Sequence, residues 1–243
     1  MDPAADLDAL PSLSRREAAR ARGLDKLPRW YSPWAHLAAT TGVGVATLTL
    51  ALSQLHGVRP LELLVLPATF VFANAFEWRV HKKVLHKRTW PFQLLFDRHT
   101  PQHHVVFTED DMALRSTREF GLVLIPAIGV LGAVISAAPA ALLLGWLASA
   151  NAGWLMLATS GLYMVFYELS HLVYHVPEDH PIGGSPLVRK LRRHHARHHD
   201  PRHMQRYNFN VTVPLFDWIM GTMAPATESP NPGTVSDARA PAR

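Results

Sequence analysis

The uncharged stretch "FGLVLIPAIGVLGAVISAAPAALLLGWLASANAGWLMLATSGLYMVFY" spans residues 120–167. It runs for 48 residues without an Asp, Glu, Lys or Arg. A helix needs about 20 mainly apolar residues to cross the hydrocarbon core of a bilayer, because its backbone polar groups must be satisfied without water. The stretch is too long for one crossing, so we predict two membrane helices with a connection near Pro139.

Two further apolar stretches precede this run. Ala35–Leu55 is uncharged, and Leu61–Phe76 carries one charge, Glu62, near its end. Arg59 and Pro60 lie between them and mark a tight turn. Together with residues 120–167 they predict an all-α membrane protein with four transmembrane helices, arranged as two hairpins.

The basic residues predict how the chain lies in the membrane. Lys and Arg number 24 against 19 Asp and Glu, and they gather before the first stretch, between the second and third, and after the fourth. By the positive-inside rule both termini are cytoplasmic, in a bacterial inner membrane or the endoplasmic reticulum. This accounts for the basic excess without a nucleic-acid partner. No apolar stretch precedes residue 35, so we expect no cleavable signal peptide.

The chain has no cysteine and 15 histidines, so any metal must be held by nitrogen and oxygen. Ten histidines form four clusters that follow the two hairpins, two after each. They are His81 and His86; His99, His103 and His104; His171 and His175; and His195, His198 and His199. The remaining His36, His56, His180 and His203 are expected to be bystanders, and His194 is left open.

The spacing within the clusters suits a metal site. Residues three or four apart share one face of a helix, so His99 with His103, His171 with His175, and His195 with His198 and His199 are each expected to face a common centre. The spacing of five in "HKKVLH" (His81, His86) requires an irregular turn. A phosphate-binding basic tract is the alternative for "RKLRRHHARHH" (residues 189–199), but membrane topology explains its arginines.

These motifs resemble those of the fatty acid hydroxylase and sterol desaturase superfamily of integral membrane di-iron enzymes. The pattern HxxxxH, HxxxHH, HxxxH and HxxHH reads here through the ten histidines, over roughly residues 65–222. The segment "NFNVTVPLFDWIMGT" (residues 208–222) is also similar, although "NFN" replaces the commoner Asn-aromatic-Gly. The resemblance implies a membrane domain over residues 31–222 with a cytoplasmic helical cap that holds two metals. A polar segment (residues 1–30) and a disordered tail (residues 223–243) flank it.

The chemistry expected of this site is oxygen-dependent hydroxylation of a lipid C–H bond, most simply in a fatty acyl chain. Ten imidazoles divide into about five per iron and leave a position on each ion for dioxygen. Zinc would also bind such nitrogens but has no redox chemistry. "HPIGG" (residues 180–184) resembles a cytochrome b5 haem motif, but there is no room for that domain. Electrons must therefore come from a separate partner, such as a ferredoxin or cytochrome b5.

Carboxylates near the clusters are candidates for orienting the imidazoles. Glu77, Asp97, Glu168 and Asp200 each lie within four residues of a predicted ligand. Two other functions stay open. One is a desaturase or oxidase that acts on a sterol, carotenoid or related polycyclic lipid, and the other is a non-enzymatic metal-binding membrane protein.

Overall fold

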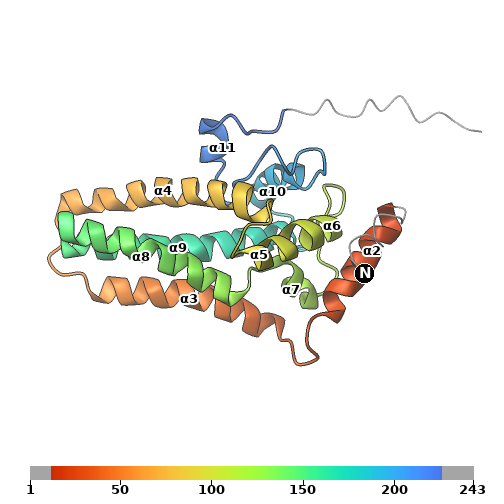
Figure 1. Cartoon of the computed structure of the whole chain (residues 1–243), viewed down its shortest axis with the longest axis horizontal. Coiled ribbons are helices and arrows are strands. Elements are labelled where there is room, and N and C mark those ends of the chain that lie inside the picture. The colour runs from red at the N-terminus through yellow and green to blue at the C-terminus, as the bar shows by residue number, and fades with distance from the viewer. Residues whose placement is uncertain (1–11, 226–243) are drawn as a thin grey trace, which may run out of the picture.

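A computed structural model describes residues 12–225. Within this range it contains helices and no strand, so the predicted all-α class is confirmed. Four long helices run side by side along the long axis of the molecule, and shorter helices gather at one end (Figure 1). We call this end the cap. It comprises residues 12–25, 81–123 and 175–225.

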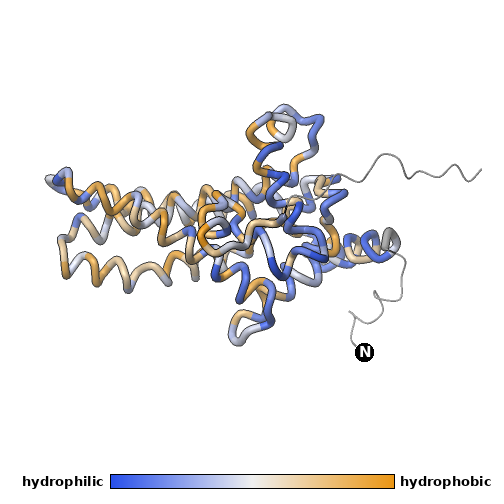
Figure 2. Tube along the Cα trace, turned by 90° about the horizontal axis from the view of Figure 1, so that it is seen from above, coloured by the Kyte–Doolittle hydropathy of each residue, from blue (hydrophilic) through white to orange (hydrophobic). Residues whose placement is uncertain are grey.

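The long helices are α3 (Pro33–Ser53), α4 (Val65–Val80), α8 (Ala127–Leu147) and α9 (Ala150–Tyr174). A 3-10 helix, η1 (Pro60–Leu64), leads into α4. Among residues 12–225, three stretches are long and apolar enough to cross a membrane: Pro33–Ser53, Pro60–Leu85 and Ala127–Leu147. This half of the molecule is mostly hydrophobic and the cap is mostly hydrophilic (Figure 2). Because apolar side chains cover the outside of the long helices, the chain is a membrane protein.

Helix α9 is the longest helix and the most buried one. It packs against α3, α4 and α8, and it carries polar residues such as Asn151 and Glu168. Two glycines let α3 approach it closely, because a Cβ at Gly161 would lie 2.7 Å from the carbonyl oxygen of Gly44. The predicted fourth span thus corresponds to this central helix, which is not one of the three apolar stretches named above.

The predicted connection near Pro139 is wrong. Pro139 lies inside α8, and the chain turns at Ala148 and Ser149, where the Ser149 hydroxyl accepts a hydrogen bond from the Ala152 N–H and caps α9. A serine at the N-cap accepts a hydrogen bond from a first-turn N–H that has no partner within the helix, so it favours the start of a helix there. Proline removes only one backbone donor, and α8 continues through it. The uncharged run also begins with a separate short helix, α7 (Phe120–Val123), in the cap.

One carboxylate ties together the two hairpin turns at the end away from the cap. Glu62, 7% exposed, accepts hydrogen bonds from the hydroxyl of Ser149 at 2.6 Å and the amide of Asn151 at 3.2 Å. It also accepts from the N–H of Arg59 at 2.7 Å. The one charge in the two apolar stretches of the first hairpin therefore joins that hairpin to the second.

The cap is built from short helices, two of which are π-helices. In chain order they are α2 (Ser12–Asp25), π-helix η2 (His81–Leu85), α5 (Gln93–Arg98), π-helix η3 (His99–His103), α6 (His104–Val106), 3-10 helix η4 (Thr117–Glu119), α7, α10 (Pro186–His198) and α11 (Leu215–Ile219). Their apolar core includes Val106, Phe107 and Leu122. The predicted N-terminal segment contributes α2 to this core. Of the predicted tail, Ala224 is 9% exposed and donates its N–H to Asn208, while residues 226–243 lie outside the described part.

A buried ion pair holds α2 on the cap. Arg20 and Glu119 are 4% and 2% exposed, and their Nη1 and Oε2 atoms lie 2.5 Å apart. The same carboxylate oxygen accepts the N–H of Arg115 at 3.1 Å. By contrast, the pair between Arg88 and Asp97 is exposed at both side chains.

We expect Glu119→Ala to lower the free energy of unfolding by about 3–5 kcal/mol, because it leaves the Arg20 guanidinium buried and unpaired. Asp97→Ala is the control, and removal of its exposed pair should cost less than about 1 kcal/mol. Unfolding of both variants can be followed in detergent with denaturant or heat. Equal losses of stability in the two variants would contradict this account of how α2 is held.

Candidate metal centre

The structure brings all ten predicted histidines together in the cap. They form two groups in which one ring nitrogen of every member lies within 4.8 Å of the others. The first group is His81, His86, His99, His104 and His198, and the second group is His103, His171, His175, His195 and His199. Every one of the ten is at most 8% exposed. The expected division of five imidazoles per metal is therefore available.

Helix type decides which histidines share a group. In the π-helices the partners are five residues apart, His81 with His86 and His99 with His104, and the N–H of His86 bonds back to the carbonyl of His81. In the α-helices they are four apart, His171 with His175 and His195 with His199. The irregular turn predicted for "HKKVLH" is thus confirmed as η2.

Two predicted groupings are wrong. His99 and His103 were expected to face one centre, but η3 is a π-helix, so His104 shares the group of His99 and His103 turns to the second group. His198 likewise leaves His195 and His199 and joins the first group. The groups are neighbours, since the rings of His104 and His199 stack at 4.2 Å between centroids.

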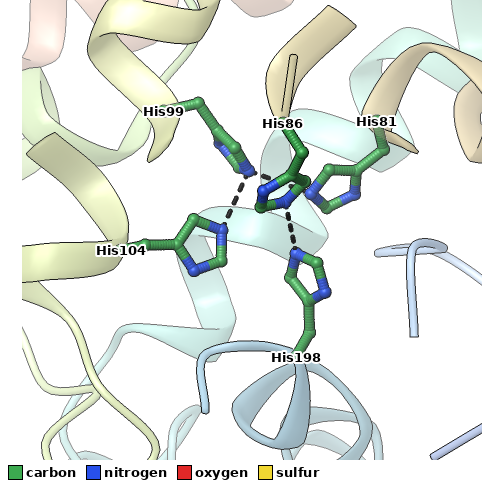
Figure 3. Close-up of side chains that lie close together, drawn as sticks. All are labelled: His81, His86, His99, His104 and His198. Carbon is green, nitrogen blue, oxygen red and sulfur yellow. Dashed lines mark hydrogen bonds between the residues drawn. The ribbon is translucent and has the colours of Figure 1, made fainter. Parts of the chain in front are cut away.

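The Nε2 atoms converge within each group. Figure 3 shows the first group, with His99 between His81 and His104 and with His86 facing His198. The Nε2–Nε2 distances are 2.9 Å for His81–His99, 2.9 Å for His86–His198 and 3.0 Å for His104–His99. In the second group, His171–His103 is 3.2 Å and His199–His195 is 3.1 Å. Neighbouring ligands about 2.1 Å from one ion at right angles would lie about 3.0 Å apart.

Backbone carbonyls fix the tautomers of half of these histidines. Each of the five holds its Nδ1 against a carbonyl oxygen, which can only accept, so Nδ1 carries the hydrogen. The pairs are His81 with Phe209, His103 with Leu122, His175 with Met112, His198 with Tyr207, and His199 with Phe107. In a neutral imidazole this leaves a lone pair on Nε2. The Nε2 of His175 has no hydrogen-bond partner at all.

The hydroxyl of Thr100 does the same for His86. Thr100 donates its own hydrogen to the carbonyl of Leu85 at 2.7 Å, so its oxygen accepts from Nδ1 of His86 at 3.1 Å. Both His86 and His198 therefore point lone pairs at one another across 2.9 Å. Two lone pairs at this distance repel, and a cation between them would convert the repulsion into coordination. The donor set fits a metal ion.

Burial keeps these imidazoles neutral. Desolvation lowers the pKa of His86 to about 2 and that of His103 to about 4. It also lowers the pKa of His99, His104 and His199 well below the ordinary value. Since only the neutral ring offers a lone pair to a metal, the groups are in the ligand form at neutral pH.

Two phenylalanines cover the groups. Phe209 packs on His81, His86 and His198 at centroid distances of 6.0, 6.2 and 5.7 Å. Phe107 packs on His103 and His175 at 5.2 and 4.5 Å. Both side chains are completely buried. Each thus shields one group from water with its ring and fixes one histidine of a group with its carbonyl.

Three of the four carboxylates proposed to orient the imidazoles bind other groups instead. Within residues 12–225, none of them hydrogen-bonds to any of the ten histidines. Asp97 pairs with Arg88, and Asp200 pairs with Arg202. Glu77 accepts from Tyr163 and from the N–H groups of Val211 and Thr212. Glu168 is fully buried, but no histidine donates to it. The prediction failed because carbonyls, which every residue has, leave no trace in the sequence.

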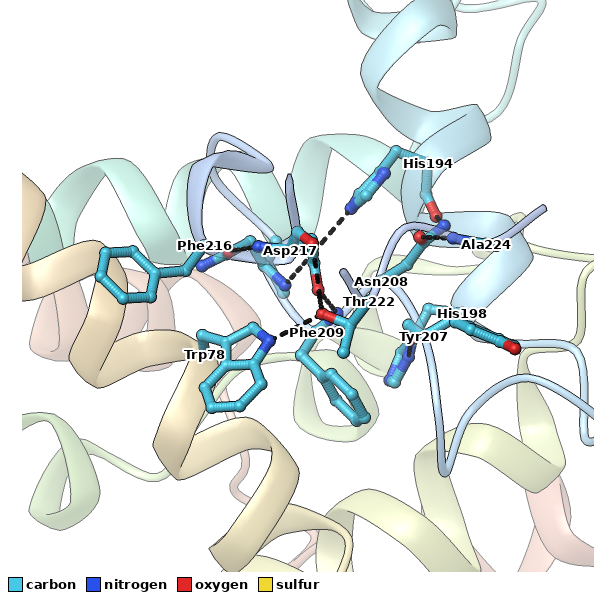
Figure 4. Close-up of polar contacts among 12 residues, drawn as sticks. Trp78, His194, His198, Tyr207, Asn208, Phe209, Phe216, Asp217, Thr222 and Ala224 are labelled. Carbon is cyan, nitrogen blue, oxygen red and sulfur yellow. Dashed lines mark hydrogen bonds and ion pairs between the residues drawn. The ribbon is translucent and has the colours of Figure 1, made fainter. Parts of the chain in front are cut away.

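Asp217 is the acidic residue that sequence reasoning missed. It is fully buried and accepts from the N–H groups of Phe209 and Asn210, at 2.9 and 2.8 Å, and from the hydroxyl of Thr222. Figure 4 shows how Asp217 in α11 ties the loop that contains Phe209 to Thr222, which follows α11. This loop presents the carbonyls that hold His81 and His198. An acid within the mostly apolar "VPLFDWIM" was the available signal.

The remaining histidines lie outside both groups. His194 binds Asp217 at 3.1 Å, so it joins the support of the loop rather than the ligands. His36 binds the carbonyl of Ile125 and the hydroxyl of Tyr31. His56, His180 and His203 were also predicted as bystanders, and none belongs to a group. In "NFN", Asn208 adopts φ 56°, which asparagine tolerates better than most residues.

Two openings adjoin the centre. A narrow cavity of about 30 Å³ reaches ligands of both groups, His99, His103 and His171, between apolar residues of α5, α7 and α9. A wider cleft of about 590 Å³ lies on the cap surface, between the acidic residues 109–111 and arginines of α10. Its wall includes Met112, whose carbonyl holds His175. The centre is thus approached from two sides, one mainly apolar and one charged.

Comparison with known proteins gives one match. A family model described as fatty acid hydroxylase matches residues 66–222, a segment that contains all ten histidines. No curated protein and no solved structure matches the chain.

We expect the purified protein to hold about two metal ions per chain after saturation with ferrous iron, since five ligands suit one ion. His104→Ala should retain about one ion, in the second group, because it removes a ligand of the first group. His175→Ala should also retain about one ion, in the first group, because it removes a ligand of the second. His180→Ala is the control and should retain both. Elemental analysis after desalting measures this, and a full complement in His104→Ala would refute the grouping.

We also expect Asp217→Ala to weaken metal binding at the first group about ten-fold or more, because it frees the loop that orients His81 and His198. The second group should be nearly unaffected. Asp97→Ala, which removes a carboxylate two residues from His99, should change neither affinity. Stepwise removal of iron by a chelator resolves the two sites. Equal weakening of both would show that Asp217 stabilises the cap in general.

Proposed function

Because the chain belongs to the fatty acid hydroxylase family, we propose that it is an integral membrane di-iron enzyme that hydroxylates a lipid C–H bond with dioxygen. The family is one of oxidoreductases, and the histidine groups offer a metal site. The observation that carries the proposal is the convergence of Nε2 lone pairs in two adjacent groups of five. When bound, two irons would supply the redox chemistry by which dioxygen attacks an unactivated C–H bond.

The ten histidines would hold these ions, five each, and leave one position of each octahedral ion open. Iron is proposed over zinc because hydroxylation needs a redox metal, although zinc can occupy such nitrogen ligands in purified protein. Phe107 and Phe209 would keep water from the ions. The carbonyls on Nδ1 would keep the rings in place throughout the reaction.

The membrane arrangement that we propose has four spans, with α9 as the fourth. Exposed tryptophans near both ends of the long helices support this arrangement. Trp34 and Trp90 lie at the cap end, 62% and 81% exposed, and Trp146 lies near the opposite turn, 82% exposed. Tryptophan is enriched at both membrane interfaces. The basic residues of the cap support a cytoplasmic side for the cap and both termini, in a bacterial inner membrane or the endoplasmic reticulum.

A lipid would enter from the membrane through the narrow cavity, with its chain among the apolar side chains of α5, α7 and α9. Its polar end would stay at the interface, because burial of a polar group in hydrocarbon costs several kcal/mol. The ligands lie at and just beyond the cap ends of the spans, so the oxidised carbon should lie near the polar end. The narrowness of the cavity favours a slender acyl chain.

A desaturase or oxidase of a sterol, carotenoid or related polycyclic lipid is the alternative within the same chemistry. It would need the cavity to widen for fused rings. A non-enzymatic metal-binding protein is the alternative of another class. Against it stands the apolar access to ligands of both groups, which a storage or sensing site would not need.

Electrons would come from a separate redox protein, such as a ferredoxin or cytochrome b5. The charged cleft offers a place for it. Arg189 and Arg193 on α10 are exposed and make no ion pair within residues 12–225, whereas Arg192 is buried against Glu178. Unpaired cations suit an acidic partner. The cleft also reaches Met112, whose carbonyl holds His175, a member of the second group.

We expect iron-loaded protein in bilayers, given a ferredoxin and its reductase, to convert a long-chain fatty acid into a hydroxy acid. With ¹⁸O₂, one labelled oxygen atom should appear in the product, within the first few carbons from the carboxyl group. Fragmentation mass spectrometry locates it. His103→Ala, which removes a ligand beside the cavity, should abolish the product, and His180→Ala should retain it.

Other products would decide against this proposal. An alkene without labelled oxygen would support the desaturase alternative. A hydroxyl in the terminal half of the chain would refute the entry geometry. No oxidised lipid at all, from protein that holds two irons and accepts electrons, would favour the non-enzymatic alternative.

A further inference from the structure

Arg98 is the one charged residue in the described lining of the narrow cavity, apart from the histidines. It ends α5 and directly precedes the ligand His99. The rest of the lining is apolar or aromatic, from Leu95, Leu122, Ile125 and their neighbours. A cation therefore sits in an apolar wall, next to the place where a lipid would meet the metals.

The guanidinium of Arg98 lacks a counter-ion within residues 12–225. Its one hydrogen bond within this range is from Nη2 to the carbonyl of Gly121, at 2.5 Å. A guanidinium has five N–H donors, and half-burial without an anion is costly. Burial accordingly lowers the pKa of Arg98. Two cap arginines that are more deeply buried, Arg20 and Arg192, have carboxylate partners.

The position of Arg98 matches the level of lipid head groups. Its helix α5 exposes Leu94, and the residues just before it expose Phe92 and Trp90, at 55%, 49% and 81%. Such a row of exposed apolar and aromatic side chains beside a basic residue is typical of a segment that lies in the membrane interface. A lipid that enters here would pass Arg98 with its polar end.

We infer that Arg98 binds the anionic head group of the lipid substrate, a carboxylate or a phosphate, and so selects charged lipids over neutral ones. This rests on the proposed function and deepens it by naming the substrate class. Arginine pairs with carboxylate and phosphate through two parallel N–H bonds, which its free donors allow. Because His99 follows Arg98 directly, the bound head group holds the first carbons of the chain beside the metal ligands.

Two polar groups near Arg98 are already bonded to each other and to the backbone. The His36 Nε2–H donates to the carbonyl of Ile125, so its Nδ1 accepts from the Tyr31 hydroxyl at 2.9 Å. Tyr31 lies against Gly121, the residue whose carbonyl Arg98 binds. Burial raises the pKa of Tyr31 to about 12, so at neutral pH the phenol carries no negative charge that could pair with Arg98.

Lipid binding to the metal-loaded protein tests the site without turnover if oxygen is excluded. Tritiated hexadecanoic acid and its methyl ester share one chain and differ in the charge of the head. At pH 8 we expect wild type to bind the acid about ten-fold more tightly or better, because one charge-assisted pair is at stake. Scintillation proximity on immobilised protein measures both affinities. Equal affinity for acid and ester would overturn the inference and needs no variant.

Variants then assign the effect to Arg98. Arg98→Gln should reduce the preference for the acid to less than about three-fold and leave ester binding unchanged. Arg98→Lys keeps the positive charge and should retain most of the preference for the acid. Arg88→Gln is the matched control, since this arginine is exposed, lies ten residues upstream and is already paired with Asp97. An undiminished preference in Arg98→Gln, in protein with normal metal content, would also overturn the inference.

Competition identifies the kind of anion. Displacement of the acid by hexadecyl phosphate at a lower concentration than by unlabelled acid would support the site and assign it to a phosphate head, and the reverse would assign it to a carboxylate. Failure of the proposed function looks different. Protein that binds the acid through Arg98 but never oxidises it would refute the enzyme and leave this site. Oxidation of acid and ester at equal rates, with equal affinities, would refute the site alone.

Discussion

The cap depends on a repulsion that the protein alone does not relieve. Buried, neutral imidazoles point Nε2 lone pairs at one another across about 3 Å, because backbone carbonyls hold the hydrogen on the opposite nitrogen. Rotation of the rings would break those carbonyl bonds, and protonation is opposed by burial. The hydrogen bonds that Asp217 and Glu77 accept from the backbone of Phe209 and Val211 hold the histidines in an arrangement that is favourable only around a cation.

Two π-helices are the local devices that make the convergence possible. An α-helix places residues i and i+4 on one face, so a single α-helix would send His99 and His103 to the same ion. The wider turn of η3 sends His99 and His104 to the first group and His103 to the second. One short segment thereby serves both ions, and α10 does the same through His195, His198 and His199. Such turns recur at functional sites because they re-aim side chains without ending the helix.

Most of the fold and the ten histidines of the site could be predicted from the sequence. The division of these histidines into two groups and the partners of their Nδ1 atoms could not. Charge-free length predicts membrane helices, and histidine spacing marks the ten residues, because both are properties of side chains. The turn at Ser149 was placed near Pro139, since a proline is more conspicuous than a serine cap. The division between groups depends on helix type, and the Nδ1 partners are carbonyls such as those of Phe209 and Leu122. Backbone groups have no letter in a sequence, so neither feature was predictable.

The shared use of η3 and α10 also couples the two ions. Whichever ion binds first immobilises both segments, and with them ligands that belong to the other group. The conformational entropy lost at that step is not lost again when the second ion arrives, so the second should bind more tightly than it would to an empty cap. Loading should then be cooperative, with chains that hold two ions or none outnumbering chains that hold one when iron is scarce.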